Sequence, residues 1–478
     1  MRRRLLATVF LAVAATAAAR EIPNFPPASV ILGQPSGTSD TAVFPPTTRS
    51  LANPSGVAID PQTGRVFVAD TTHHRVVRYA NFAALTTGAP ATFAFGQTDL
   101  TTAVTGTSAS RLNAPTGIWL DASGRLWVAD SGNHRVLMFR SAASRVDAAP
   151  AADLVLGQPS FGPANSATSV SGMSSPSGLT VDATDRLWVA DTGNNRVLEF
   201  ESASALTSGA PATGVIGQST FDDADPRSDQ LGLSDPLGVA VDSARTLWVA
   251  DSGNHRVLGY PSAGTVSNGT NAARVIGQPD FNVTTAGTSA SRLTAPSGLF
   301  ADQKQNLWVI DGGNHRALRF AGLASLNNGA PASSLIGQPD FASTATRLSP
   351  FHLDHPGIGI VIDPSLDVWL ADTGSNRVLK FANVDSEIPT IQARGRKKVK
   401  TRRRRLTLRG TASDDTAVTQ VLIKVRGQRG LRVATGTNSW NKRIRLKGRS
   451  RRIVAKAFAF DAVGNRSRAA RKIFVRRR

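Results

Sequence analysis

The segment WVADSGNHRVL, from Trp127 to Leu137, places an acid, a histidine and an arginine within six residues of one another. Asp130, His134 and Arg135 have the side chains that general acid–base catalysis uses, because a histidine exchanges protons near neutral pH and a carboxylate can orient its ring. A lone copy of this segment would therefore be a candidate reaction centre.

Related segments occur six times, and the aspartates that they share are 60 or 61 residues apart. A reaction centre is needed only once, so a pair of side chains in every repeat is expected to serve the fold. We predict that each aspartate forms an ion pair with the arginine five residues later and fixes the turn between them, which is worth about 1 kcal/mol if the pair is exposed. The predicted pairs are Asp70/Arg75, Asp130/Arg135, Asp191/Arg196, Asp251/Arg256, Asp311/Arg316 and Asp372/Arg377.

The residue before this arginine is a histidine in four repeats and an asparagine in two. The ligands of one metal ion must lie within about 2 Å of it, whereas equivalent positions of separate repeats lie far apart. We therefore expect exposed turn residues at this position and no metal site. The residues are His74, His134, Asn195, His255, His315 and Asn376.

Each repeat contains four strand-like segments that are rich in Val, Leu and Trp and are separated by Gly, Asn and Asp. Six repeats of four strands predict an all-β fold, a six-bladed β-propeller. A linear solenoid is the alternative, but it would need polar caps at its ends. The last repeat lacks its fourth strand, so we expect the N-terminal segment Ala28–Pro35 to supply it and to close the ring.

One aromatic residue lies in the second strand of every repeat, between apolar neighbours. An aromatic stripe could form a stacking platform for sugars or bases, but its position within a strand favours packing between blades. The six residues are Phe67, Trp127, Trp188, Trp248, Trp308 and Trp369.

The pattern P-x-G-x-x-x-D, followed by V-A-D and then by G-N-H-R-V, resembles the NHL repeat, with Val or Ala in place of the leucine, as in NHRV from Asn133. The resemblance implies a six-bladed propeller, which we place at residues 28–384. Propellers of this kind serve as protein- or RNA-binding modules, as sensor ectodomains and, in one branch, as metal-dependent amidating lyases. The resemblance therefore implies no single activity, and no three histidines here match those that hold the metal of the lyases.

Two connections that do not repeat carry groups that could bind a ligand. The segment FHLDHPG contains His352, Asp354 and His355, which suit zinc or acid–base chemistry, although a polar loop is the simpler interpretation. The segment FDDADPRSDQ supplies carboxylates that suit calcium, but it lacks the spacing and the closing glutamate of an EF-hand. Those carboxylates belong to Asp222, Asp223 and Asp225. We expect no cofactor, with calcium or zinc at these loops as the alternative.

Residues 1–19 have the form of a secretory signal peptide. Three arginines precede an apolar run, from Leu5 to about Ala19, that ends in small residues and is short for a transmembrane span. The chain contains no cysteine, which excludes disulfides and thiolate chemistry. We expect a secreted or extracytoplasmic bacterial protein with no transmembrane segment after removal of the signal peptide.

The basic excess of the chain lies in its C-terminal part. Residues 389–478 contain 29 Lys and Arg against 3 Asp and Glu, whereas the rest of the chain contains 26 basic and 31 acidic residues. The alternating segments of residues 406–478 resemble bacterial Ig-like β-sandwich domains, and we expect a basic linker at 385–405. The surplus of 29 − 3 = 26 positive charges favours a polyanion, an anionic cell-surface glycan or extracellular nucleic acid. A solvated basic surface without a partner is the alternative.

These features favour a secreted, non-catalytic binding protein that recognises a protein or glycan through the connecting loops of its propeller. The alternative is a metal-dependent lyase or hydrolase whose site lies on the same face, near His352 and His355.

Overall fold

The computed structural model describes residues 27–261 and 267–382 continuously. In the C-terminal part it describes residues 390–393, 398–401, 405–413, 418–425, 432–435, 439–445, 452–461, 467 and 470–476. The predicted signal peptide, residues 1–19, lies outside the described residues.

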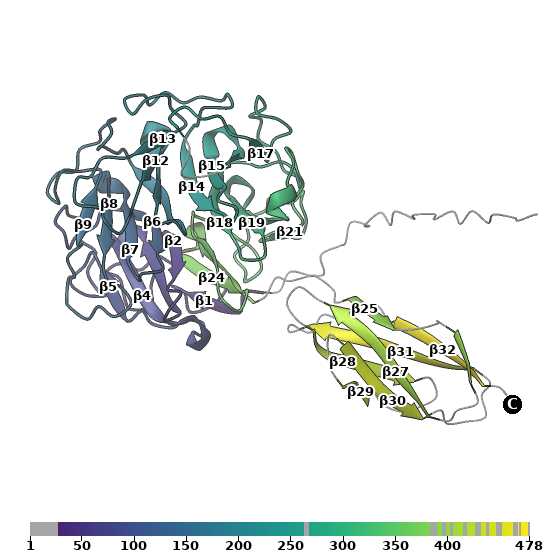
Figure 1. The fold of residues 1–478 in the computed structure, drawn as a ribbon. Coiled ribbons are helices and arrows are strands. Elements are labelled where there is room, and N and C mark those ends of the chain that lie inside the picture. The colour runs from purple at the N-terminus through teal and green to yellow at the C-terminus, as the bar shows by residue number, and fades with distance from the viewer. Residues whose placement is uncertain are drawn as a thin grey trace, which may run out of the picture.

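Residues 30–381 form six four-stranded antiparallel sheets, which are the blades of the predicted propeller (Figure 1). The first blade consists of β2 (Pro54–Ile59), β3 (Arg65–Asp70), β4 (Arg75–Asn81) and β5 (Phe93–Phe95), from the inner strand outward. The second to fifth blades are β6 (Pro115–Leu120), β7 (Leu126–Asp130), β8 (Arg135–Phe139) and β9 (Leu154–Leu156); β10 (Pro176–Val181), β11 (Leu187–Asp191), β12 (Arg196–Phe200) and β13 (Gly214–Ile216); β14 (Pro236–Val241), β15 (Leu247–Asp251), β16 (Arg256–Tyr260) and β17 (Arg274–Ile276); β18 (Pro296–Ala301), β19 (Asn306–Asp311), β20 (Arg316–Ala321) and β21 (Ser334–Ile336).

The sixth blade combines both ends of the propeller, as predicted from the missing fourth strand. Its inner strands are β22 (Ile360–Ile362), β23 (Val368–Asp372) and β24 (Arg377–Phe381), and β1 (Val30–Leu32) pairs with β24 as the outer strand. The ring is therefore closed by an N-terminal strand, which leaves no open edge in this blade.

The second and third strands of each blade are joined by a one-turn 3-10 helix. The turns emerge on the same side of the propeller as the long connections from each outer strand to the next inner strand, and we call this side the loop-bearing face. The turns are η1 (Thr71–His73), η3 (Ser131–Asn133), η4 (Thr192–Asn194), η5 (Ser252–Asn254), η6 (Gly312–Asn314) and η8 (Thr373–Ser375). Two further 3-10 turns, η2 (Phe82–Ala84) and η7 (Leu323–Ser325), follow third strands.

The repeated aromatic residues pack between blades, as expected. Trp127, for example, is buried in one cluster with Leu187 and Val189 of the following blade. The structure adds a contact that the sequence did not suggest, because each indole Nε1–H donates to the aspartate that ends its own inner strand. In the second blade Trp127 donates to Asp121 over 2.9 Å. A buried indole usually finds such an acceptor for its polar N–H, because an unpaired N–H is costly to bury.

The C-terminal part forms two sheets, in agreement with a small β-sandwich. One sheet has the strand order β25-β27-β30 and the other has the order β26-β32-β31-β28-β29. The strands are β25 (Thr390–Ala393), β26 (Lys398–Thr401), β27 (Arg405–Ser413), β28 (Val418–Val425), β29 (Arg432–Val433), β30 (Ser439–Arg445), β31 (Arg452–Asp461) and β32 (Ala470–Arg476). Leu408, Val421, Ile423 and Trp440 lie in its core.

The expected linker at 385–405 needs correction. Thr390–Ala393 pairs with β27 and Lys398–Thr401 pairs with β32, so both segments are strands of the sandwich. The basic composition of this segment suggested a solvated connection, but the alternation of apolar and polar residues in TIQA and KVKT is also typical of a strand.

Among the residues that the structure describes, no helix has the length and apolarity needed to cross a membrane.

Candidate functional site

The repeated aspartate–arginine pairs are buried parts of the scaffold. Asp130 Oδ2 accepts from Arg135 Nε over 2.7 Å, and the corresponding distance in the other five blades is 2.6 or 2.7 Å. Every arginine of the set is at most 1% exposed. The estimate of about 1 kcal/mol for an exposed pair therefore does not apply, because removal of one partner from a buried pair typically costs about 3–5 kcal/mol.

Burial and hydrogen bonding act against each other at these aspartates. Desolvation raises the pKa of Asp251 and of Asp372 to about 6, although Arg256 and Arg377 lower it. Asp130 also accepts from Asn133 Nδ2 over 2.8 Å and from the backbone N–H of Asn113 over 2.6 Å. The carboxylates are therefore buried and saturated with donors, which makes them unsuitable as proton-transfer groups.

Each arginine also anchors the long connections of the loop-bearing face. The Arg135 guanidinium donates to the carbonyl oxygens of Ser108 and Arg111 over 3.1 Å, in the connection before its blade. It reaches the carbonyl oxygen of Phe161 over 2.5 Å, in the connection after its blade. A guanidinium with five donors can bind several carbonyl oxygens at once. The arginine of each repeat therefore fixes the backbone of the connections before and after its blade.

The glutamine of the repeated Gly-Gln motif has a related role. Gln158 Nε2 donates to the carbonyl oxygens of His134 and Asn165, over 3.1 and 2.8 Å, and thereby ties the turn of its own blade to the next connection. The preceding Gly157 has a φ of +84°, and a Cβ there would lie 2.9 Å from Met173. Only glycine fits this backbone conformation without strain.

The interpretation of the histidine position as an exposed turn residue was wrong. His134 is half-buried, and its Nδ1 accepts from the backbone N–H of Ser175 in the next blade over 3.0 Å. The same hydrogen bond links all six blade pairs, with acceptor Nδ1 of His74, His255 and His315 and acceptor Oδ1 of Asn195 and Asn376. Histidine and asparagine interchange here because both side chains offer an acceptor at a similar reach. Burial lowers the pKa of His74 and of His315.

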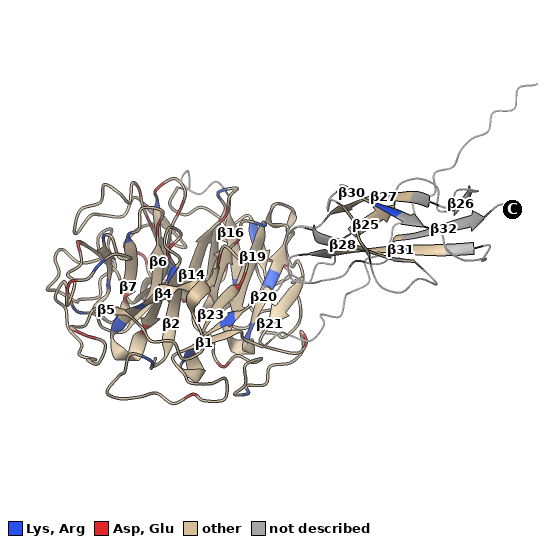
Figure 2. Cartoon of the chain, turned by 90° about the horizontal axis from the view of Figure 1, so that it is seen from below, with Lys and Arg blue, Asp and Glu red and all other residues tan. Residues whose placement is uncertain are grey.

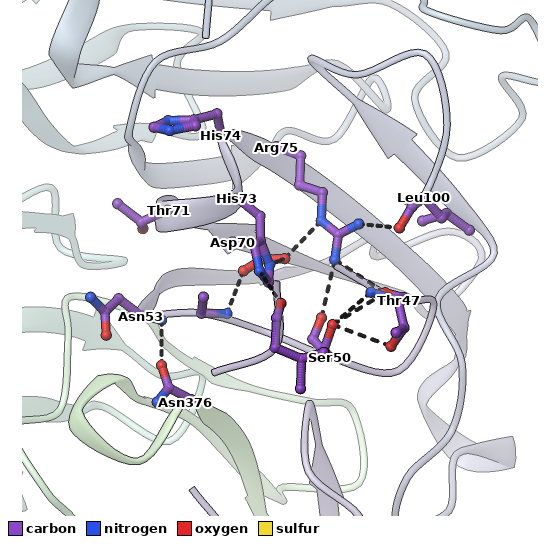
Figure 3. A network of polar contacts seen from close by, with 12 residues as sticks. Thr47, Ser50, Asn53, Asp70, Thr71, His73, His74, Arg75, Leu100 and Asn376 are labelled. Carbon is purple, nitrogen blue, oxygen red and sulfur yellow. Dashed lines mark hydrogen bonds and ion pairs between the residues drawn. The ribbon is translucent and has the colours of Figure 1, made fainter. Parts of the chain in front are cut away.

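The first blade departs from the repeat at the end of its turn, where His73 takes the place of Asn133. Figure 3 shows His73 and Arg75 directed at the same carboxylate of Asp70. His73 Nδ1 lies 2.8 Å from Asp70 Oδ2, and Nε2 lies 3.0 Å from the carbonyl oxygen of Val43. The ring of Phe44 packs edge-on against His73 at a centroid distance of 4.8 Å. This buried histidine thus holds the connection of residues 33–53 in place.

The predicted group of His352, Asp354 and His355 is brought together only in part. The potential ligand atoms of His315, Asp354 and His355 lie within 4.8 Å of one another. His352 does not join them, because its Nδ1 is 2.8 Å from the hydroxyl of Ser349. Sequence analysis missed His315, since it treated the repeated histidine and the loop histidine separately. The clue was the offset of 40 residues between His315 and His355, because a hydrogen bond joins the two corresponding positions in the other blades.

The hydrogen bonds of this cluster limit its use as a metal site. His315 Nδ1 accepts the backbone N–H of His355 over 3.1 Å, so its proton lies on Nε2 and neither nitrogen offers a free lone pair. His355 Nδ1 lies 2.6 Å from Asp354 Oδ1, which leaves His355 Nε2 and the second carboxylate oxygen as available ligand atoms. His355 is 72% exposed. Two available ligand atoms are fewer than the three protein ligands of a catalytic zinc site.

The aspartates proposed for calcium do not converge. Asp222, Asp223 and Asp225 are exposed, and within the described parts of the chain the only group of three potential ligands is the one that contains His315. Asp225 instead contributes its backbone carbonyl to Gln218 over 2.9 Å. Close spacing in sequence did not suffice, because an extended loop points successive side chains in different directions.

The loop-bearing face also exposes large apolar side chains. Six of the eight that the described residues expose lie in the connections between blades. They occupy four connections that follow one another around the ring, residues 338–355, 33–53, 97–114 and 158–175. The six are Val43, Phe44, Val104, Val170, Leu348 and Phe351. Both signs of charge are spread over the propeller (Figure 2). We call these six apolar residues the apolar arc.

Comparison with known proteins supports the assignment of the repeat. The NHL repeat matches residues 51–79, 112–139, 173–200 and 233–260, which cover the three inner strands of the first four blades. No curated protein sequence matches the chain significantly.

The chain is also similar to two solved structures at low identity. Virginiamycin B lyase from Staphylococcus aureus is 11% identical, with a TM-score of 0.38, over 74% of this chain and 88% of that one. The fibronectin(III)-like modules of CbhA from Clostridium thermocellum are 13% identical, with a TM-score of 0.18, over 36% of this chain and 85% of that one. The repeats, the six closed blades and the repeat match together establish that the chain carries NHL repeats assembled into a β-propeller.

Proposed function

We propose that the propeller is an interaction module that binds a protein partner through the apolar arc of its loop-bearing face. The observation that carries this proposal is the gathering of Val43, Phe44, Val104, Leu348 and Phe351 on neighbouring connections. Phe44 is 58% exposed and Phe351 is 40% exposed. Exposed large apolar groups gathered on one face are typical of protein-binding surfaces, and NHL propellers commonly have this role.

The anchoring of the loops supports the same function. Buried arginines hold the backbones of the connections, so the apolar side chains are presented on a surface that needs little ordering when a partner binds. A preorganised surface loses less conformational entropy on association. The repeated residues thus supply rigidity, and the residues that differ between repeats supply recognition.

A displayed library of random peptides tests this proposal. Peptides selected on the natural chain are expected to bind the double variant Phe44→Ser/Phe351→Ser at least ten-fold more weakly, as measured by calorimetry, because aromatic anchors dominate such interfaces. Val146→Ser is the matched control, since Val146 is 88% exposed but lies outside these connections. Equal affinity for the natural chain and the double variant would contradict the proposal, and binding to a glycan array with no peptide selected would favour a glycan ligand.

We further propose export of the protein, on the evidence of the arginine-led apolar segment at residues 1–19. Expression in a bacterium should yield a mature chain in the extracytoplasmic fraction that begins at Arg20, which intact-mass measurement would reveal. An unprocessed chain in the cytoplasm would contradict the proposal.

The C-terminal domain is proposed to bind polyanionic surfaces. Residues 389–478 hold 29 basic residues against 3 acidic ones, and Arg409, Arg443 and Lys456 are exposed on its strands. Binding to heparin and to DNA should weaken steeply between about 50 and 200 mM salt. Removal of residues 389–478 should abolish it, and retention of binding by the truncated chain would contradict the proposal.

A metal-dependent lyase or hydrolase is the second candidate, favoured only by the proximity of His315, Asp354 and His355. It requires a change of the His315 tautomer and the loss of a hydrogen bond between blades. Metal analysis after incubation with zinc distinguishes the two functions, because a stoichiometric ion that is lost in His355→Ala would support the enzyme. Zinc content that is the same in both proteins would contradict it.

A further inference from the structure

The six inner strands enclose a cavity on the propeller axis. Its volume is about 920 Å³, and its lining includes residues of all six inner strands and of the turns that follow five of them. A cavity of this size lies in the range that holds small organic ligands. It is separate from the apolar arc, because its open end is on the side of the turns between first and second strands.

The end of the cavity nearest to the loop-bearing face is narrow. A Cβ on Gly117 would lie 2.1 Å from the carbonyl oxygen of Ser177, and a Cβ on Gly178 would lie 2.3 Å from that of Leu237. Neighbouring inner strands are therefore in backbone contact at this level. The cavity widens from this glycine level toward the turns, and the chain from Gly117 to Leu120 spans about 10 Å of its depth at about 3.3 Å per residue.

The wall of the cavity is mainly aliphatic, although Trp119 and Phe300 also contribute to its lining. One ring of side chains, at the residue after each glycine, is equally exposed in every blade, at 5–6%. This ring consists of Val57, Ile118, Leu179, Val239, Leu299 and Ile360. Two residues farther on, Ile59, Leu120, Val181 and Ile362 continue the wall, and Ala301 leaves extra room in the fifth blade. A cylinder lined by branched aliphatic groups suits an alkyl chain.

The mouth of the cavity is acidic. The charged residues of its lining are Asp121, Asp182, Asp185, Asp302, Asp363 and Arg125. Arg125 bridges Asp121 and Asp185, over 2.5 and 3.0 Å. Asp182 and Asp302 accept from neutral donors, the indole N–H groups of Trp188 and Trp308. Carboxylates at the rim attract a cation and repel an anion, and low-dielectric walls strengthen both effects.

We propose that this cavity binds an aliphatic amine, with its alkyl chain along the axis and its ammonium group at the acidic mouth. The aliphatic wall selects the chain and the carboxylates select the charge. This site is independent of the proposed function, because it lies on the opposite side of the propeller and uses none of the residues of the apolar arc.

Titration calorimetry with decylamine, decanol and decanoate below their micelle concentrations tests the two parts of the proposal. The three probes share one alkyl chain length and differ in the charge of the head group at pH 7. We expect decylamine to bind with a stoichiometry of one, decanol to bind more weakly and decanoate to bind at least ten-fold more weakly than the amine. Equal binding of the amine and decanoate would overturn the proposal.

Two kinds of variant show where decylamine binds. Ala301→Phe fills the cavity and should reduce decylamine binding at least ten-fold, and Ala301→Leu, which copies Leu120, should reduce it less while keeping the fold. Ala342→Phe, at an exposed alanine of the loop-bearing face, is the matched control. Asp185→Asn should weaken decylamine several-fold and leave decanol unchanged. Unchanged binding in both Ala301 variants, with natural thermal unfolding, would show that the probe binds elsewhere and would overturn the proposal.

Discussion

At the scale of single residues, the side chains that most resemble an active site are those that stabilise the scaffold. Asp130 is fully buried and accepts from three donors, the guanidinium Nε–H of Arg135, the side-chain amide of Asn133 and the backbone N–H of Asn113. His134 Nδ1 accepts a hydrogen bond from the backbone N–H of Ser175 in the next blade. A residue that transfers protons to a substrate must be accessible to it, and Asp130 is not accessible.

Arg135→Lys is expected to lower the free energy of unfolding by about 3 kcal/mol. Lysine keeps the positive charge but cannot reproduce the fork with which the guanidinium reaches Asp130 and the carbonyls of Ser108 and Arg111. Chemical denaturation followed by tryptophan fluorescence measures the change. Arg140→Lys, at an exposed position beyond the same strand, is the control. Equal stability of the two variants would contradict the assignment of Arg135 to the scaffold.

His315 should make stability depend on pH in a defined direction. Its pKa is lowered in the folded chain, so the unfolded chain binds its proton more readily. Stability should therefore fall as the pH drops below about 6.5 and level off below the pKa of the folded state. His315→Asn keeps an acceptor, as Asn195 does, and removes this titration. The fall in unfolding temperature from pH 7 to pH 5 should be smaller in His315→Asn, and an equal fall would contradict the prediction.

At the scale of elements, β1 matters more than its three residues suggest. Val30, Ile31 and Leu32 are at most 7% exposed, and they complete the blade that joins the two ends of the propeller. Deletion of Ala28–Pro35 should therefore sharply lower the unfolding midpoint, because it exposes β24 as an open edge and removes three buried side chains. A chain that begins at Pro27 is the control. An unchanged midpoint after the deletion would show that closure does not stabilise the ring.

The elements themselves could be predicted from the sequence, because each blade repeats the same alternation and the same turn. The missing fourth strand after Phe381 even indicated where β1 belongs. Contacts between repeats could not be predicted in the same way. The hydrogen bond from His355 to His315 joins residues 40 positions apart, and only the closed ring brings them together. Composition also misled at 385–405, where basic residues concealed the strands β25 and β26.

At the scale of the whole molecule, the chain combines a symmetric scaffold with asymmetric surfaces. Six copies of one hydrogen-bond network fix the blades, so few of the repeated side chains remain available for function. The apolar arc lies on one side of the propeller and the axial cavity opens on the other. The apolar arc is formed by residues at which the repeats differ, such as Phe44 and Phe351, whereas the cavity is lined by repeated positions and is widened where Ala301 departs from the repeat. Two ligands could thus be bound without competition.

The two domains should unfold separately. The core of the sandwich, around Leu408, Ile423 and Trp440, contains only C-terminal residues, whereas the large clusters of the propeller continue from blade to blade. Calorimetry of the full chain is therefore expected to show two transitions, of which the propeller transition persists at the same temperature after removal of residues 389–478. Because that removal also takes away 26 net positive charges, the comparison should be made at about 150 mM salt, where long-range repulsion is screened. A single transition, or a propeller midpoint that moves on truncation, would show instead that the domains stabilise each other.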